Sequence, residues 1–235
     1  MQAVVPAAGE GTRLRPLTAD RPKGLVEVAG KPLLTHVFET LAALDVTDVV
    51  VVVGYRGDDI CEFYGGSFEG TPLTYVRQDD RRGLGHAVLQ AAPHVDGDFV
   101  VLNGDNVCRA NVEEVIARHR GTDADATLLV EEVSRERAAR GGVVDHEDGE
   151  VTGLVEKPAD PPSTLVPRGF FAFSEAIFPV CRLVTPGHTG EIELTAAVDL
   201  LVSAGRRVET VDLSGWCVNV NTGADRERVA DLLGR

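Results

Sequence analysis

The chain has 235 residues, which is long enough for one α/β domain with a substantial core. Its formal net charge of −14 disfavours nonspecific binding to nucleic acid or to an anionic membrane face. Apolar residues are spread along the chain without a run of bilayer-spanning length, and the first residues lack a signal-peptide pattern. We therefore expect a soluble cytoplasmic protein with no nucleic-acid or membrane partner, and a homo-oligomer is left open.

Cysteine and lysine are both rare in this chain. The cysteines are far apart and form no C-x-x-C pair, which indicates neither a zinc site nor a disulfide framework. We expect four reduced structural thiols: Cys61, Cys108, Cys181 and Cys217. Against 37 acidic residues, the only lysines are Lys23, Lys31 and Lys157. This composition is typical of a halophilic cytoplasm, although biased codon usage would deplete lysine too, and a lysine retained in such a chain indicates a function.

Short apolar runs alternate with amphipathic stretches in the first half of the chain, which is the pattern of βαβ units. The expected strands are 2–6, 48–53, 73–77, 98–103 and 126–133. The expected helices are 33–44, 58–64, 85–92 and 112–118. This order predicts a Rossmann-like α/β fold, with a mixed, mainly parallel sheet flanked by helices.

The pattern changes after about residue 140. The string GGVVDHEDGEVTGLVEKP indicates a hairpin that turns at HEDGE, and PADPPS is a proline-rich loop. The elements expected after this loop are a strand at 168–173, helices at 176–183 and 191–204, a strand at 207–213 and a helix at 225–233. Since no repeat or convincing linker is present, we predict a single domain with a late insertion.

The first expected strand, QAVVP, leads into the glycine-rich string AAGEGTR. Ligands of open α/β sheets bind beyond the carboxyl ends of the strands, which is where this loop begins. Gly9 and Gly11 let backbone N–H groups approach phosphate oxygens, while Arg13, Arg15 and Lys23 can supply positive charge. The loop therefore predicts a phosphate site.

Two common phosphate loops do not match this string. A Walker A loop needs G-x-x-x-x-G-K-[ST], and a Rossmann loop needs glycine where Leu14 stands. The whole string GEGTRLRPLTADRPK resembles instead the N-terminal motif of the sugar-1-phosphate nucleotidylyltransferases. These enzymes make nucleotide sugars from a nucleoside triphosphate and a sugar 1-phosphate, and the resemblance implies the nucleotide-diphospho-sugar transferase type of α/β fold.

The resemblance implies roles for the residues of this motif. Arg13 would hold the leaving pyrophosphate, and Lys23 would reach the α-phosphate. Residues 1–133 would form the nucleotide-binding part, and residues 134–235 the sugar-phosphate-binding part. Four residues of the loop would bind the nucleotide: Ala8, Gly9, Gly11 and Thr12.

A second matching segment is QDDRRGLGHAV. By resemblance, Gln78 would pair with a pyrimidine base and Gly83 would offer its backbone to the base edge. A glutamine amide can donate to a carbonyl and accept from an imide N–H, the edge that uracil and thymine share. Taken alone, Gln78 would be interpreted as a solvated loop residue.

The string VEKP continues the resemblance on the sugar side. Glu156 would bind sugar hydroxyls and Lys157 the sugar phosphate, although the two could also be a plain ion pair on a hairpin edge. Gly142 and Gly169 match glycines that pack near the sugar. Glu191 matches an acidic helix-start residue on the sugar side, or is a carboxylate favoured by the helix dipole.

A magnesium site is implied by two further segments. LNGDN places Asp105 after an apolar strand, where a carboxylate can bind Mg²⁺, although a lone aspartate there is usually a turn residue or helix cap. The family's ending resembles W-x-x-D-[IV]-G, whose aspartate is the second ligand. Here GWCVNVNTGAD has Asn219 at that position and Asn221 in place of glycine. One negative charge is missing, so we expect weaker metal binding, and impaired activity is left open.

The reaction implied is nucleotidyl transfer from UTP or dTTP to a sugar 1-phosphate, with glucose 1-phosphate as the default sugar. The motifs look similar to those of short archaeal enzymes that lack a C-terminal β-helix. Three alternatives stay open. A regulatory nucleotide-sugar-binding protein is suggested by Asn219, a guanylyl- or cytidylyltransferase is disfavoured by Gln78, and a nicotinamide-dependent dehydrogenase lacks the third loop glycine.

Overall fold

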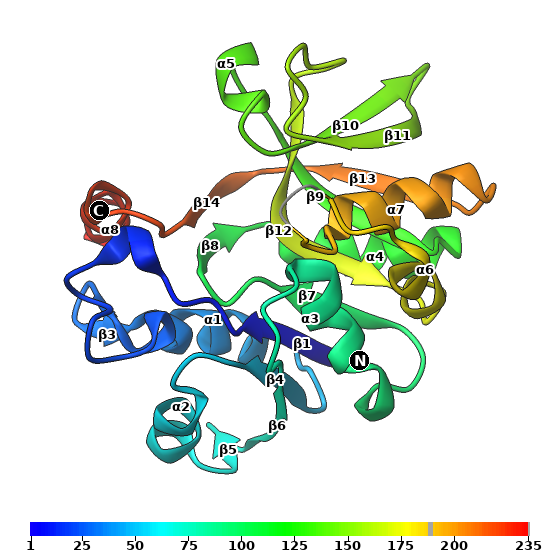
Figure 1. Ribbon diagram of the computed structural model, residues 1–235. Helices are drawn as coiled ribbons and strands as arrows, with labels where there is room; N and C mark the ends of the chain where they lie inside the picture. Colours follow the sequence, from blue (N-terminus) through cyan, green and yellow to red (C-terminus); the bar gives the residue numbers. More distant parts are fainter. Residues whose placement is uncertain (188–189, 235) are drawn as a thin grey trace.

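The computed structural model describes residues 1–187 and 190–234 of the chain (Figure 1). Within these residues, the main sheet has eight strands in the order β13-β9-β12-β7-β1-β4-β6-β5. Their bounds are β1 Gln2–Ala7, β4 Val49–Val53, β5 Ser67–Phe68, β6 Thr71–Arg77, β7 Phe99–Leu102, β9 Ala126–Glu132, β12 Leu165–Phe173 and β13 Val208–Asp212. Strands β7, β1, β4 and β6 are parallel, β13 is parallel to β9, and β12 is antiparallel to both of its neighbours. The predicted mixed, mainly parallel sheet is confirmed.

The other strands form three short pairs: β2 Glu27–Val28 with β3 Lys31–Pro32, β8 Asn106–Ala110 with β14 Gly215–Asn219, and β10 Gly142–Glu147 with β11 Glu150–Glu156. The α-helices are α1 Leu33–Ala42, α2 Gly57–Tyr64, α3 Leu84–Gln90, α4 Val112–Thr122, α5 Arg135–Ala138, α6 Ile177–Leu183, α7 Leu194–Ser203 and α8 Gly223–Leu233. In the described part of the chain, no helix has the length and apolarity that a membrane crossing requires.

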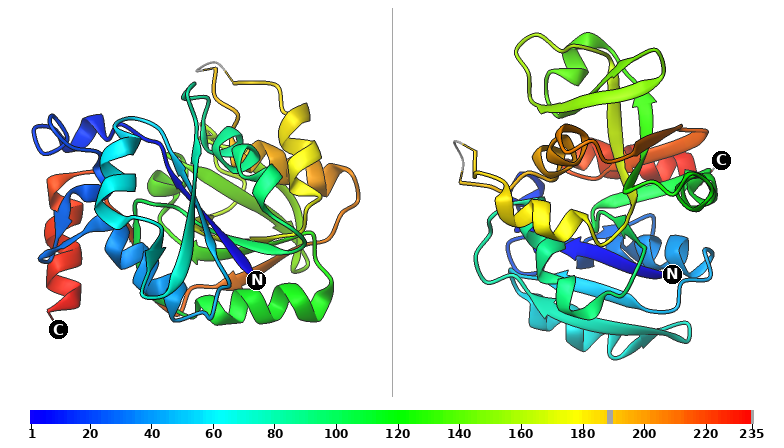
Figure 2. Two further views of the ribbon diagram at one scale, coloured as in Figure 1. Left: turned by 90° about the horizontal axis from the view of Figure 1, so that it is seen from below. Right: turned by 90° about the vertical axis from the view of Figure 1, so that its right-hand side faces the viewer.

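Successive side chains of the central strands point to opposite faces of the sheet, so the core consists of two layers. Val50 and Val52 of β4 belong to one apolar cluster, while Val49, Val51 and Val53 belong to the other. Helices α3, α6 and α7 contribute to the first cluster and α1 and α4 to the second, so helices cover both faces of the sheet (Figure 2). A strand buried on both faces needs a continuous apolar run, which β4 provides.

The predicted hairpin forms and stands above the main sheet in Figure 1. Its two-residue turn consists of Asp148 and Gly149, both with positive φ, as a tight hairpin turn requires. The backbone N–H of Leu154 in β11 donates to the Asp199 carboxylate of α7 over 3.0 Å. The hairpin is therefore tied to the body of the domain through α7.

Several expected boundaries are wrong. Helix α7 begins at Leu194, because the backbone of Ile192 donates to the Arg82 carbonyl and accepts from the Gly85 N–H instead of joining the helix. Strand β12 begins at Leu165, because its first residues also pair with β9. The short elements β2, β3, β5, β8, β14 and α5 were not expected.

The expectation of four reduced cysteines is wrong for two of them. Strand β14 pairs antiparallel with β8 and places Cys217 directly opposite Cys108. The Cα atoms of the two residues are 4.1 Å apart, and their sulfurs form a disulfide. Cys61 and Cys181 are free thiols. The disulfide joins residues 109 positions apart in sequence, and strand register brings them together, which a spacing argument does not detect.

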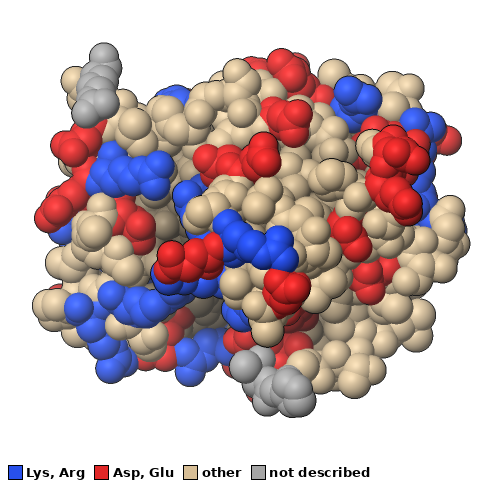
Figure 3. Space-filling model, turned by 90° about the horizontal axis from the view of Figure 1, so that it is seen from above, with Lys and Arg blue, Asp and Glu red and all other residues tan. Residues whose placement is uncertain are grey.

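The acidic composition predicts that stability depends on salt. Acidic and basic side chains are interspersed on the face drawn in Figure 3, and exposed ion pairs such as Arg56–Asp59 contribute little each. A net charge of −14 leaves the folded chain under self-repulsion. We expect the melting temperature to rise between about 0.1 M and about 1 M KCl, where the Debye length falls from ~10 Å to ~3 Å.

Differential scanning calorimetry in a KCl series would measure this effect. Sucrose at matched osmolality is the control, because it changes water activity without screening charge, and it should raise the melting temperature less. Equal melting temperatures across the KCl series would contradict the expectation.

Candidate functional site

A cleft lies beyond the carboxyl ends of β1, β6 and β7. Its nucleotide-side cavity has a volume of about 610 Å³, and a cavity of about 260 Å³ adjoins it at the glycine-rich loop. A third cavity, also of about 260 Å³, extends toward β11, β12 and α7. Six residues predicted to bind the nucleotide line the nucleotide-side cavity: Ala8, Gly9, Gly11, Thr12, Gln78 and Gly83.

The glycine-rich loop depends on Gly11 for its shape. Gly11 has a φ of 66°, and a Cβ at this position would lie 3.0 Å from the Cβ of Lys23. The Thr18 hydroxyl donates to the Gly11 carbonyl over 2.9 Å and holds the turn. Gly9 borders two of the cavities and has no atom within 4 Å of the place where its Cβ would stand. The backbone at Gly9 is therefore open to a ligand.

Two cations converge on one asparagine beside this loop. The Lys23 ammonium lies 2.7 Å from Asp105 Oδ2 and donates to Asn221 Oδ1 over 2.9 Å. Arg13 donates to the same Asn221 oxygen over 3.0 Å. The Asn221 amide nitrogen donates in turn to Asn219 Oδ1 over 2.6 Å. Three segments far apart in sequence thus form one hydrogen-bonded group, in which the Lys23 side chain is only 11 % exposed.

Arg15 was expected to supply positive charge to a bound phosphate, but it pairs with a carboxylate of the protein. Its guanidinium pairs with Glu10 over 2.6 Å, and Arg81 pairs with the same carboxylate from the other side of the cleft. Arg81 and then Arg15 hold the pKa of Glu10 below its usual value. Glu10 therefore links the phosphate loop to the loop that follows β6.

Gln78 and Gly83 lie together on the far side of the nucleotide-side cavity. The Gln78 side chain is buried, and its Nε2 donates to the carbonyl oxygen of Gly83 over 3.1 Å. Gly83 has a φ of 91°, and a Cβ at this position would lie 2.8 Å from the carbonyl oxygen of Ile192. Only glycine allows this contact between the first and second parts of the chain.

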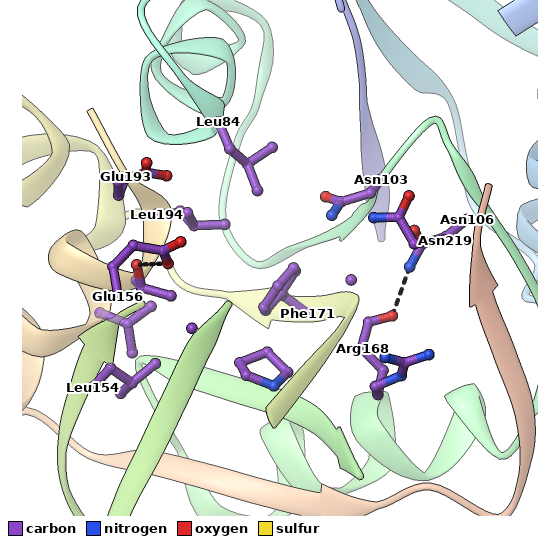
Figure 4. Close-up of a pocket in the computed structure, with 15 residues that line it drawn as sticks. Leu84, Asn103, Asn106, Leu154, Glu156, Arg168, Phe171, Glu193, Leu194 and Asn219 are labelled. Carbon is purple, nitrogen blue, oxygen red and sulfur yellow. Dashed lines mark hydrogen bonds between the residues drawn. The ribbon is translucent and has the colours of Figure 1, made fainter. Parts of the chain in front are cut away.

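Glu156 of the predicted Glu–Lys pair lines the sugar-side cavity (Figure 4), and Lys157 forms an ion pair with it. One Glu156 oxygen accepts from the Thr195 hydroxyl over 2.9 Å, and the other lies 3.1 Å from the Lys157 ammonium. The Glu156 hydrogen bond raises the pKa of Lys157, while burial, followed by the charge of Glu156, raises the pKa of Glu193. A Cβ on Gly142 would lie 2.3 Å from Thr195 Cγ2, so only glycine fits there.

Gly169 lines the sugar-side cavity. Its φ is 73°, and a Cβ there would lie 2.2 Å from the amide nitrogen of Asn106. That nitrogen donates to the Arg168 carbonyl over 2.7 Å (Figure 4). The Oδ1 atoms of Asn103 and Asn106 are buried without a hydrogen-bond partner among the described residues. Both asparagines line the cavity, so a ligand hydroxyl could satisfy acceptors that are costly to leave unpaired.

Glu191 lines the nucleotide-side cavity, but the expectation that it starts a helix is wrong. Its Cβ lies 2.9 Å from the position that a Cβ on Gly83 would occupy. Glu193 is the N-cap residue of α7 and lines the sugar-side cavity instead. The carboxylate at the start of the helix is therefore that of Glu193, whereas the sequence analysis placed the helix start at Glu191.

The two residues predicted to bind a metal both lie in the cleft. Asp105 and Asn219 line the same cavity, and each presents an oxygen donor. The described residues include no group of three or more His, Cys, Asp or Glu side chains that could hold a metal. This donor set fits an ion of the magnesium type, which commonly uses one or two carboxylates and completes its coordination with water and substrate phosphates.

Several cleft residues were missed by the sequence reasoning, Asn106 and Glu193 among them. Asn221 was noticed only as a departure from the family pattern, yet it joins Arg13, Lys23 and Asn219. Asn103 stands in the same LNGDN string as Asp105 and could have been found from that position. Thr195 follows the GEIEL string, but no local pattern indicates that its hydroxyl reaches Glu156.

This fold and cleft define a class of protein: an α/β nucleotide-binding domain with a glycine-rich phosphate loop and an adjoining polar cavity. The Nucleotidyl transferase family model matches residues 2–218, and the chain belongs to this family. The resemblance seen in the motifs is thereby confirmed at the level of the family and over nearly the whole chain.

Two relatives illustrate the similarity. The chain is 47 % identical over 234 residues to the UTP–glucose-1-phosphate uridylyltransferase AglF of Haloferax volcanii, covering 99 % of this chain and 96 % of that protein. It is 38 % identical to a glucose-1-phosphate thymidylyltransferase of Streptomyces griseus, covering 99 % of this chain but 66 % of the relative. The Haloferax relative agrees with the halophile-type composition.

Solved structures match the fold over the whole chain. UDP-glucose pyrophosphorylase complexed with UDP-glucose has a TM-score of 0.89 at 24 % identity, covering 99 % of this chain and 98 % of that one. UTP-bound UGPase from Acinetobacter baumannii has a TM-score of 0.87 at 25 % identity, with coverage of 99 % and 93 %. The predicted nucleotide-diphospho-sugar transferase type of fold is confirmed.

Proposed function

We propose that the protein transfers a uridylyl or deoxythymidylyl group from UTP or dTTP to glucose 1-phosphate, releasing pyrophosphate and forming a nucleotide sugar. The observation that carries this proposal is the continuity of the cleft, since the nucleotide-side and sugar-side cavities share Leu84, Asn103 and Asn219. A nucleoside triphosphate and a sugar phosphate would meet where the two cavities join. The name of the Haloferax relative describes this reaction with UTP.

The two parts of the chain would divide the substrates between them. Residues 1–133 would bind most of the nucleotide, and residues 134–235 most of the sugar phosphate. Gln78 and Gly83 would contact the base. The open backbone beside Gly9 and the bend at Gly11 support a triphosphate position against the loop residues Ala8, Gly9, Gly11 and Thr12.

The reaction joins a phosphate oxygen of the sugar 1-phosphate to the α-phosphorus and breaks the bond from that phosphorus to the pyrophosphate oxygen. A phosphate monoester is largely ionised near neutral pH, so no general base is required, and catalysis consists of positioning and charge neutralisation. Lys23 would stabilise charge at the α-phosphate, Arg13 at the leaving pyrophosphate and Lys157 at the sugar phosphate. The shared acceptor Asn221 supports a joint position for Arg13 and Lys23.

Glu156 would accept hydrogen bonds from sugar hydroxyls, with its carboxylate oriented by Thr195. Gly142 and Gly169 would keep the cavity open, because a side chain at either position would overlap its neighbours. Glu191, assigned by resemblance to the sugar side, lines the nucleotide-side cavity, so we propose that it contacts the substrate there.

Asp105 and Asn219 would hold Mg²⁺ together with phosphate oxygens of the substrate. The bound ion would neutralise negative charge on those oxygens. Only one of the two protein ligands is charged, so we expect weak metal affinity in the absence of a triphosphate.

The test is pyrophosphate release by the purified protein in about 1 M KCl, chosen to screen its charge, with Mg²⁺, glucose 1-phosphate and one triphosphate at a time: UTP, dTTP, CTP, GTP or ATP. We expect release with UTP or dTTP, and the faster of the two identifies the base. No release with any of the five, repeated with other sugar 1-phosphates, would overturn the proposal in favour of a regulatory binding protein.

A further inference from the structure

The amide of Gln78 is held by two groups of the protein itself. Gln78 follows β6, and only 4 % of its surface is exposed. Its Nε2 atom lies 3.1 Å from the carbonyl oxygen of Gly83 and 2.9 Å from Nδ1 of His86 in α3. The orientation of this amide is therefore a property of the folded chain before any ligand arrives.

The carbonyl oxygen of Gly83 determines which atom of the Gln78 amide is the nitrogen and which is the oxygen. A carbonyl oxygen only accepts hydrogen bonds, so the amide atom facing it must be the nitrogen. An amide nitrogen carries two hydrogens, and the second points to His86 Nδ1. No donor from the described residues reaches the Gln78 oxygen, which is left as the free polar atom of a side chain that lines the nucleotide-side cavity.

The ring of His86 must accept at Nδ1 for this arrangement to hold. A neutral imidazole that accepts at Nδ1 carries its proton on Nε2, which lies 3.2 Å from the amide nitrogen of Gln90, so the Gln90 amide must be turned to place its oxygen there. Gln90 has no other side-chain hydrogen bond among the described residues and is partly exposed, so its amide is free to present its oxygen to Nε2–H. Gln78 lacks this freedom, because Gly83 holds its nitrogen.

The surroundings of His86 keep the ring neutral near pH 7. Burial is the main cause that lowers the pKa of His86. The positive charge of Arg82 lowers it further, and the negative charge of Asp80 opposes both. An imidazolium would carry hydrogens on both nitrogens and could not accept from Gln78.

We infer that His86 is a positioning residue that presents the oxygen of Gln78 to the N3–H of a uracil or thymine ring. The inference rests on the proposed function and adds the group that selects the pyrimidine. Uracil and thymine carry a hydrogen at N3, which the oxygen accepts. Cytosine has a lone pair at N3, which the same oxygen repels. Without His86, the Gly83 carbonyl alone holds the amide nitrogen, so the amide turns its nitrogen toward the base more often, which suits cytosine.

Two variants of His86 separate positioning from packing. His86→Asn keeps an acceptor close to the Nδ1 position, and His86→Leu fills the space without one. For His86→Leu we expect kcat/KM with UTP to fall about tenfold, the loss of roughly one buried hydrogen bond. Most of this change should be in KM for UTP, with KM for glucose 1-phosphate unchanged. The preference for UTP over CTP should fall as well, and His86→Asn should restore most of it.

Nitrogen-15 NMR of the wild-type protein labelled at histidine gives a readout that does not depend on turnover. We expect His86 to have a bare Nδ1 and a protonated Nε2, assigned by comparison with the Asn variant. A protonated Nδ1, or an unchanged UTP/CTP preference in a folded His86→Leu protein, would overturn the inference.

Failure of the inference is distinguishable from failure of the proposed function. If the wild type releases no pyrophosphate, the proposed function fails, and the NMR result together with UTP and CTP binding by calorimetry still tests His86. If His86→Leu does not fold, His86→Gln replaces it, because its longer side chain places the amide nearer to Gln90 than to Gln78. Circular dichroism melts establish which variants are folded.

Discussion

Replacing Lys23 with alanine is expected to lower kcat for pyrophosphate release by about 10²- to 10³-fold, the usual effect of losing one preorganised electrostatic group. The proposed role of Lys23 is to stabilise charge that develops at the α-phosphate. Its side chain is only 11 % exposed, so water and salt screen its charge less than that of a surface lysine. Steady-state kinetics at saturating UTP and glucose 1-phosphate would measure the loss.

The fold should survive this substitution. The Asp105 side chain is 27 % exposed, so water can replace the ammonium group beside it. Lys31→Ala is a matched control, because it removes another of the three lysines at an exposed ion pair with Glu39. A Lys23→Ala protein with a wild-type rate would show that the assignment is wrong.

Asp105→Asn is also expected to lower the rate of pyrophosphate release strongly and to change how this rate depends on the Mg²⁺ concentration. The substitution keeps the shape of the side chain but removes the one carboxylate of the proposed metal ligands. We expect a rate loss of about 10²-fold or more at fixed Mg²⁺ and a higher Mg²⁺ concentration at half-maximal rate. Asp231→Asn on the exposed surface of α8 makes the same chemical change away from the cleft.

Asn219→Asp is the reciprocal variant. It restores a second carboxylate, so the Mg²⁺ concentration at half-maximal rate should decrease. Titrations of rate against Mg²⁺ at constant UTP would compare the two variants with the wild type. An Asp105→Asn protein whose Mg²⁺ response matches that of the wild type would exclude Asp105 as a ligand.

The sequence predicted the fold well where hydrophobic periodicity determines structure. The all-valine strand at Val49–Val53 and the amphipathic helix at Leu33–Ala42 formed within two residues of the expected bounds. It predicted poorly where pairing between distant segments decides the conformation. Strand β14 exists because it pairs with β8, and Ile192 lies outside helix α7, with its backbone bonded to the loop at Arg82.

The same division applies to the site. Motif residues such as Gly11 and Asp105 could be placed at the cleft, because the carboxyl ends of parallel strands meet at one edge of the sheet. Hydrogen-bond partners could not be predicted, since they depend on side-chain positions to within an ångström. The link from Arg13 and Lys23 to Asn221 spans about 200 residues of sequence and has no local signature.

Because β14 pairs with β8, the cleft contains segments that are synthesised at different times. The glycine-rich loop and Asp105 are made first, whereas Asn219 and Asn221 follow Asp105 by more than 110 residues. Until then Lys23 lacks its partner Asn221, and β8 lacks its paired strand. The nascent chain therefore carries an incomplete cleft until β14 and the residues that follow it have been made.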